Sequence, residues 1–143
     1  MKPLRIVIAT LLLVCGSLFA AEPPRKVWEG AEHPKDGFAS VDALRTFAET
    51  SSFGGGFLTA HRLADRDVYV VSRCFTSGVP TTELSIYLKH PEAATFYCAL
   101  FQPLRGVELR SKVAGDAIVF EQYDYGRRGW VIAMTVTRHF LDR

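Results

Sequence analysis

From residue 57 onward, apolar and polar side chains alternate with the period of two that is typical of strands with one buried face. Between residues 83 and 89, for example, Leu84, Ile86 and Leu88 fall on one side of the chain and polar residues on the other. The same alternation, or a dense run of β-branched and aromatic residues, marks the segments 67–75, 107–113, 118–120 and 130–139.

The later strands are joined by short turns at 114–116 and 125–129, which predicts hairpins. In the last strand the alternation assigns four side chains to one face: Trp130, Ile132, Met134 and Val136. Together the segments predict a six- or seven-stranded antiparallel meander sheet. Such a sheet can stay open or curl into a sandwich or half-barrel.

A helical period precedes the strands. Ser40 can cap the N-terminus, and Val41, Leu44, Phe47 and Ala48 recur at helical spacing. A helix of about ten residues is marginal alone, so it must pack on the sheet. We therefore predict an α+β fold in which residues 40–143 form one domain.

Residues 91–101 fit two structures. A proline near the start and apolar residues at helical spacing favour a helix, whereas the aromatic and threonine content favours a strand. We favour a strand over 95–102, paired with the strand that ends at Lys89.

Residues 1–21 have the three parts of a secretory signal peptide. Lys2 and Arg5 precede an apolar stretch, and small residues at Ala20 and Ala21 indicate cleavage after one of them. This stretch is shorter than a membrane-spanning helix, and no later segment is long and apolar enough to span a membrane. We expect a periplasmic or secreted protein with an extended lead-in over 22–39. Lipid attachment at Cys15 is the alternative, which Val14 before it disfavours.

Removing the leader balances the charge of the chain. Lys2 and Arg5 are two of the seventeen basic residues, so fifteen basic and fifteen acidic residues remain. Nucleic-acid binding requires a basic excess, and this chain lacks one. The same balance disfavours attachment to anionic lipid. In an oxidising compartment Cys74 and Cys98 are expected to form a disulfide, the alternatives being two thiols or a catalytic cysteine.

Few residues suggest catalysis. The four histidines lack metal-ligand spacing, and no cofactor motif is present in the sequence. His61 with Asp65 or Asp67 has the composition of two members of a hydrolytic triad, so a small exported hydrolase is one hypothesis. Aspartates are equally expected in the turn that these two occupy.

The β-hairpin tip near residue 125 is the segment most typical of binding, because tyrosine and arginine are enriched at interaction hot spots. The loop from 76 to 83 is a second candidate. Its residues 77–80, followed by an alternating strand, show a short resemblance to small periplasmic inhibitor proteins. The preferred hypothesis is a non-enzymatic binding or inhibitor-like module for an envelope or extracellular protein or a small ligand. Its candidate binding residues are Tyr123, Tyr125, Arg127 and Arg128.

Overall fold

The computed structural model describes residues 37–50 and 55–143. The predicted signal peptide and most of the lead-in lie outside the described residues. Within these two ranges the elements follow one another in the order α2 (Val41–Glu49), β1 (Gly56–Leu63), β2 (Arg66–Phe75), β3 (Thr81–Lys89), β4 (Phe96–Arg105), β5 (Leu109–Ala114), β6 (Ala117–Asp124), β7 (Gly129–Thr137) and α3 (Arg138–Leu141).

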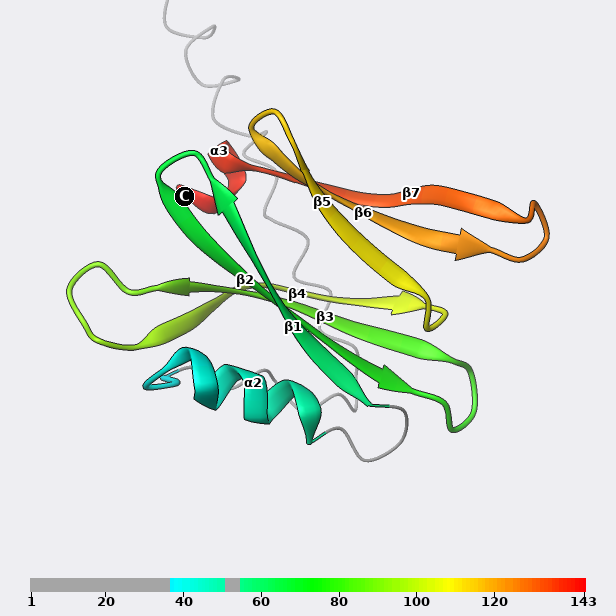
Figure 1. Ribbon diagram of the computed structural model, residues 1–143, viewed down its shortest axis with the longest axis horizontal. Helices are drawn as coiled ribbons and strands as arrows, with labels where there is room; N and C mark the ends of the chain where they lie inside the picture. The colour runs from blue at the N-terminus through cyan, green and yellow to red at the C-terminus, as the bar shows by residue number, and fades with distance from the viewer. Residues whose placement is uncertain (1–36, 51–54) are drawn as a thin grey trace, which may run out of the picture.

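The strands form two antiparallel sheets, of order β1-β2-β3-β4 and β5-β6-β7. Figure 1 shows α2 on one side of the four-stranded sheet and the three-stranded sheet on the other. The expected meander is therefore confirmed, but it is divided between two open sheets. The fold is mainly β, with one short packed helix, rather than the α+β class predicted from the sequence.

Two apolar clusters hold the three layers together. The cluster between the sheets joins side chains from both, with these fully buried members: Val68, Leu84, Ile86, Ile118 and Phe120. The cluster under the helix joins Leu44 and Ala48 to Val71, Tyr87 and Phe96. Strands β2 and β3 therefore bury both faces, whereas β5–β7 leave a broad face that no other described element covers.

The N-terminal helix forms as its sequence predicts. The Ser40 side chain accepts a hydrogen bond from the Ala43 backbone N–H at 3.1 Å, which satisfies one of the free donors of the first turn. Segment 96–105 is a strand, and its pairing of Phe96 with Lys89 confirms the expected contact with the strand before it. The bridge from Phe38 covers the first residue of that strand.

The predicted disulfide between Cys74 and Cys98 is wrong. Cys74 pairs with Thr82 on β3, whereas Cys98 pairs with Tyr87, five residues further along the same strand. That offset corresponds to about 17 Å along a strand, and a disulfide needs Cα atoms within about 7 Å. The side chains also point to opposite faces of the four-stranded sheet. Cys74 contacts the carbonyl of Val107, in the segment that connects β4 to β5, and Cys98 packs in the cluster under the helix.

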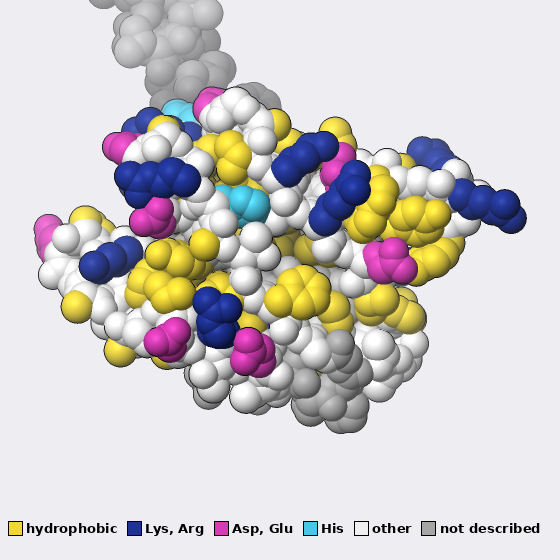
Figure 2. All heavy atoms as spheres, in the orientation of Figure 1, with side chains coloured by type: hydrophobic (Ala, Val, Ile, Leu, Met, Phe, Trp, Pro, Cys, Tyr) yellow, Lys and Arg dark blue, Asp and Glu magenta, His cyan; other side chains and the backbone are white. Residues whose placement is uncertain are grey.

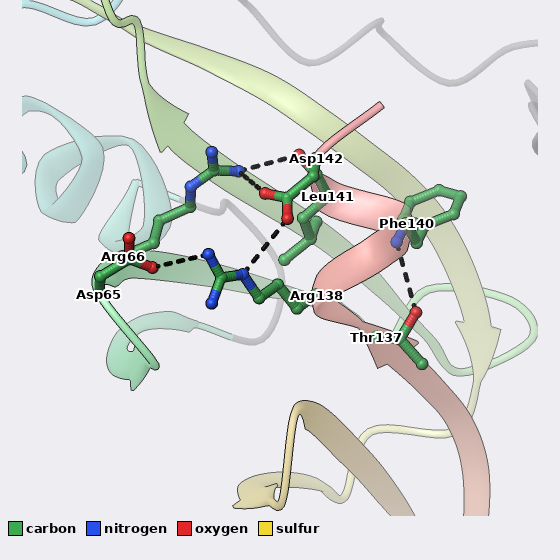
Figure 3. A network of polar contacts seen from close by, with 7 residues as sticks. All are labelled: Asp65, Arg66, Thr137, Arg138, Phe140, Leu141 and Asp142. Atoms are coloured by element: carbon green, nitrogen blue, oxygen red, sulfur yellow. Dashed lines mark hydrogen bonds and ion pairs between the residues drawn. The ribbon is translucent and has the colours of Figure 1, made fainter.

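The C-terminal helix is fixed to the β1–β2 turn by a polar network (Figure 3). The Arg66 guanidinium donates to the Leu141 carbonyl at 2.9 Å and pairs with Asp142 at 3.0 Å. Arg138 pairs with Asp65 at 3.1 Å and with Asp142 at 3.3 Å. This network holds Leu141 in the cluster between the sheets. Within the described residues, no helix has the length and apolar character needed to cross a membrane.

Candidate binding face on the three-stranded sheet

An aromatic cluster lies on the outer face of the three-stranded sheet. Tyr123 of β6 and Trp130 of β7 are directly opposite in the register, with ring centroids 5.6 Å apart and nearly perpendicular. Tyr125 follows at 5.0 Å from Tyr123 in the same edge-to-face arrangement. Tyr125 is 67% exposed and Trp130 39% exposed, so two of these three rings offer open surface.

A basic group completes the cluster. The Arg110 guanidinium of β5 lies 4.1 Å from the centroid of the Trp130 ring, a cation–π contact. Glu121 orients it: the carboxylate accepts from Arg110 Nε at 2.7 Å and from Lys112 Nζ at 2.9 Å. The hydrogen bonds from Lys112 and Arg110 lower the pKa of Glu121, so this carboxylate stays ionised while it holds both cations in place.

The tip of the β6–β7 hairpin carries two further arginines. The Asp124 carboxylate accepts from the backbone N–H groups of Gly126 at 2.9 Å and Arg127 at 3.2 Å, the turn chemistry expected of an aspartate. Arg128 adopts a positive φ of 53° to complete the turn. The Arg127 side chain is 81% exposed, and Arg128 is exposed as well.

The Tyr125 hydroxyl is also held. It donates a hydrogen bond to the Glu108 carboxylate, which raises the pKa of Tyr125 and keeps the phenol protonated. Figure 2 shows hydrophobic side chains gathered over β5–β7 at the side where this hairpin projects, with Lys and Arg side chains around them. We call this surface the aromatic-basic face; it comprises Arg110, Lys112, Tyr123, Tyr125, Arg127, Arg128, Trp130 and Ile132.

Four of these residues are those predicted from the sequence, namely Tyr123, Tyr125, Arg127 and Arg128. Trp130 and Ile132 were expected on one face together with Met134 and Val136, and that expectation is wrong. The register shifts between the Phe120–Met134 and Glu121–Ile132 pairs, so Ala133 is an extra residue in β7. Met134 and Val136 therefore face the core, while Ile132 faces solvent and is 66% exposed.

The alternative catalytic residues are not brought together. His61 lies on the face of β1 that points between the sheets, and its Nε2 is 2.7 Å from Ser111 Oγ on β5. Asp67 pairs instead with Arg62 at 2.7 Å on the opposite face of the sheet, and Asp65 pairs with Arg138. Partial burial lowers the pKa of His61. The His61–Ser111 hydrogen bond joins the edges of the two sheets, and among the described residues no carboxylate hydrogen-bonds to His61.

A depression of about 450 Å³ lies elsewhere, near the β1–β2 turn. Its charged lining includes Arg62, Asp67 and Arg66, which already form ion pairs within the protein. The described part of the chain contains no group of three or more His, Cys, Asp or Glu side chains suited to hold a metal ion.

Comparison of the chain with models of protein families, with curated proteins and with solved structures found no significant match. The class of protein is therefore inferred from the geometry of the aromatic-basic face.

Proposed function

We propose that the protein is a small exported, non-enzymatic binding module that contacts its ligand through the aromatic-basic face. The ligand is an envelope or extracellular protein, or a small molecule with apolar and anionic groups. The observation that carries the proposal is the stacked Arg110–Trp130 pair in one cluster with Tyr123 and the solvent-exposed Tyr125.

The composition of this face supports the proposal. Aromatic side chains and arginine supply large contact area and forked hydrogen bonding, and they dominate the binding energy of many interfaces. The rings pack against one another and Arg110 is fixed by Glu121, so little side-chain freedom is lost when a ligand binds. Rigid aromatic anchors of this kind are suited to binding rather than to proton or group transfer.

The sequence provides the second support, since a signal peptide over 1–21 would deliver the domain to the periplasm or the medium. In that setting a small domain with balanced charge meets proteins and small molecules, but not nucleic acid. We therefore expect the ligand in the envelope or outside the cell.

The proposal is tested by capture of ligand from envelope extract and culture medium with three variants of the tip: Tyr125→Ser, Arg127→Gln and Arg128→Asn. Asparagine tolerates the positive φ of Arg128, so the turn is preserved. Each site is exposed, so each variant should keep its thermal midpoint, with stability changes below about 0.5 kcal/mol. Combined, the three replacements should lose the captured ligand.

A matched control is Arg45→Gln, since Arg45 is exposed on α2, on the opposite side of the four-stranded sheet from β5–β7 (Figure 1). Capture that the triple variant loses and the control keeps supports the proposal. Equal capture by wild type and the folded triple variant would place ligand binding elsewhere on the molecule and refute it.

A further inference from the structure

The depression near the β1–β2 turn is a concave surface that is separate from the aromatic-basic face. Its volume is about 450 Å³, within the range of about 300–1,000 Å³ that is usual for small-molecule sites. Figure 2 shows hydrophobic side chains gathered between α2 and the β1–β2 turn, with Lys and Arg side chains beside them. The depression and the aromatic-basic face have no described residue in common, so ligand binding at one can be measured apart from the other.

Three apolar side chains form one part of the lining: Val41 from the first turn of α2, Tyr69 from β2 and Phe96 from β4. The Tyr69 and Phe96 rings pack edge to face, with their centroids 5.3 Å apart. All three side chains belong to the cluster under the helix, which fixes their positions before any ligand binds. A planar apolar group of a ligand can therefore pack against them at a small cost in side-chain freedom.

The charged part of the lining has one cation without a carboxylate partner. Asp67 pairs with Arg62 at 2.7 Å, and Asp65 pairs with Arg138 at 3.1 Å. Lys89, the last residue of β3, is exposed, and no carboxylate of the described residues forms an ion pair with it. The other two cations of the lining are each held by a carboxylate. The charge that remains for a ligand is therefore positive.

We propose that the depression binds a small organic anion in which one carboxylate is attached to an aromatic ring system. Lys89 and Phe96 are partners in the register of β3 and β4, so their side chains lie next to each other on one face of the sheet. Lys89 donates to the carboxylate, and the ring system packs against Phe96 and Tyr69. A cationic ligand is disfavoured because Asp65 and Asp67 are already engaged by arginines.

An NMR titration that follows the backbone amide signals tests the proposal, with protein purified after expression of the full chain. The probes are naphthylacetate, its neutral amide and acetate. Naphthylacetate should shift the signals of residues 62–69 and 89–96 in a saturable way, with a dissociation constant below about 1 mM. The neutral amide lacks the charge and should bind about fivefold more weakly. Acetate lacks the rings and should bind at least about tenfold more weakly.

Lys89→Gln removes the cation and should raise the dissociation constant of naphthylacetate about fivefold, whereas Lys89→Arg keeps the charge and should retain most of the affinity. Arg105→Gln is the matched control, because Arg105 is likewise an exposed last residue of a strand, at the other end of β4 from Phe96. This control should bind naphthylacetate as the wild type does. Circular dichroism checks that each variant is folded, and Lys89→Thr serves if Lys89→Gln is not.

Three results overturn the proposal. The first is a wild type whose signals do not shift, or shift only on the aromatic-basic face. The second is equal affinity for naphthylacetate and its neutral amide. The third is a folded Lys89→Gln variant that binds as the wild type does, or an Arg105→Gln variant that loses as much affinity. None of these results depends on ligand capture by the aromatic-basic face, so the two proposals can fail separately.

Discussion

Gly56 lies tightly between backbone atoms of α2 and β2, and we expect Gly56→Ala to be markedly destabilising. A Cβ atom at this position would lie 2.2 Å from the Ala48 carbonyl oxygen and 2.6 Å from the Ser72 carbonyl oxygen. Both are backbone atoms, in α2 and in β2, so no side chain can rotate to make room. One backbone segment has to move by about 1 Å to restore ordinary contact distances.

The adjacent Gly55 provides the matched control. It has a positive φ of 78°, and a Cβ atom there would meet nothing within 4 Å, so Gly55→Ala is strained in its backbone but not crowded. We expect a loss of about 1 kcal/mol for Gly55→Ala and of about 3 kcal/mol for Gly56→Ala, the upper end for overpacking. Both changes restrict the unfolded chain alike, so the difference of about 2 kcal/mol reflects the steric clash at Gly56 beyond the backbone strain at Gly55.

Urea denaturation followed by circular dichroism measures both losses. With a slope of about 1.5 kcal/mol per M, the midpoint of Gly56→Ala should fall by about 2 M and that of Gly55→Ala by less than about 1 M. If the two variants have equal midpoints, or if Gly55→Ala is the less stable, the close approach of α2 to β1 and β2 is not as described.

Two further outcomes are expected. Because burial lowers the pKa of His61 from 6.5, the unfolded chain takes up the proton first, and stability should fall as the pH drops below about 6.5 toward the lower folded pKa. Urea midpoints between about pH 5 and pH 8 should show this slope in the wild type, and a His61→Gln variant that keeps the same slope would contradict it. Expressed with its leader in a bacterial host, the protein should also be found outside the cytoplasm, with N-terminal sequencing starting at Ala21 or Glu22; soluble cytoplasmic protein retaining Met1 would refute export.

The individual strands were predictable because each depends on local alternation. The turns at 114–116 and 125–129 were predictable from the sequence, and so was the helix capped by Ser40. Which strands share a sheet was not predictable in the same way. Gly106, with a positive φ of 96°, turns the chain after β4, so that Leu109 pairs with Gln122 in a second sheet.

Two β-bulges change the faces on which side chains lie, and neither was predicted. Ala133 is the extra residue in β7, so Trp130 and Ile132 lie on the solvent side, opposite to Met134 and Val136. Ala99 is the extra residue in β4, and it places Cys98 opposite Tyr87 on the helix side of the sheet, away from the side of Cys74. A bulge inserts one residue and reverses every side chain beyond it. Alanine occurs both in regular strands and in bulges, so the alanines at these positions did not indicate that a bulge would form.

Only part of the candidate site could be predicted from the sequence, because some of its residues come together through long-range strand pairing. Tyr125 and Arg127 belong to a turn, where exposure follows from local chemistry. Arg110 and Trp130 meet only because β5 and β7 flank β6 in a common sheet, and this long-range pairing leaves no local trace in either segment.

The unequal burial of the two sheets bears on how this protein can change over evolutionary time. Strands β2 and β3 are packed on both faces, so nearly every substitution there disturbs a core. The outer face of β5–β7 supports no other layer within the described residues, so its side chains are constrained mainly by contact with solvent. Mutations can therefore change the side chains of the aromatic-basic face, on which the proposed binding depends, while the packing that keeps the domain folded stays the same. The fold thus separates the part of the molecule that must stay constant from the part that is free to diversify.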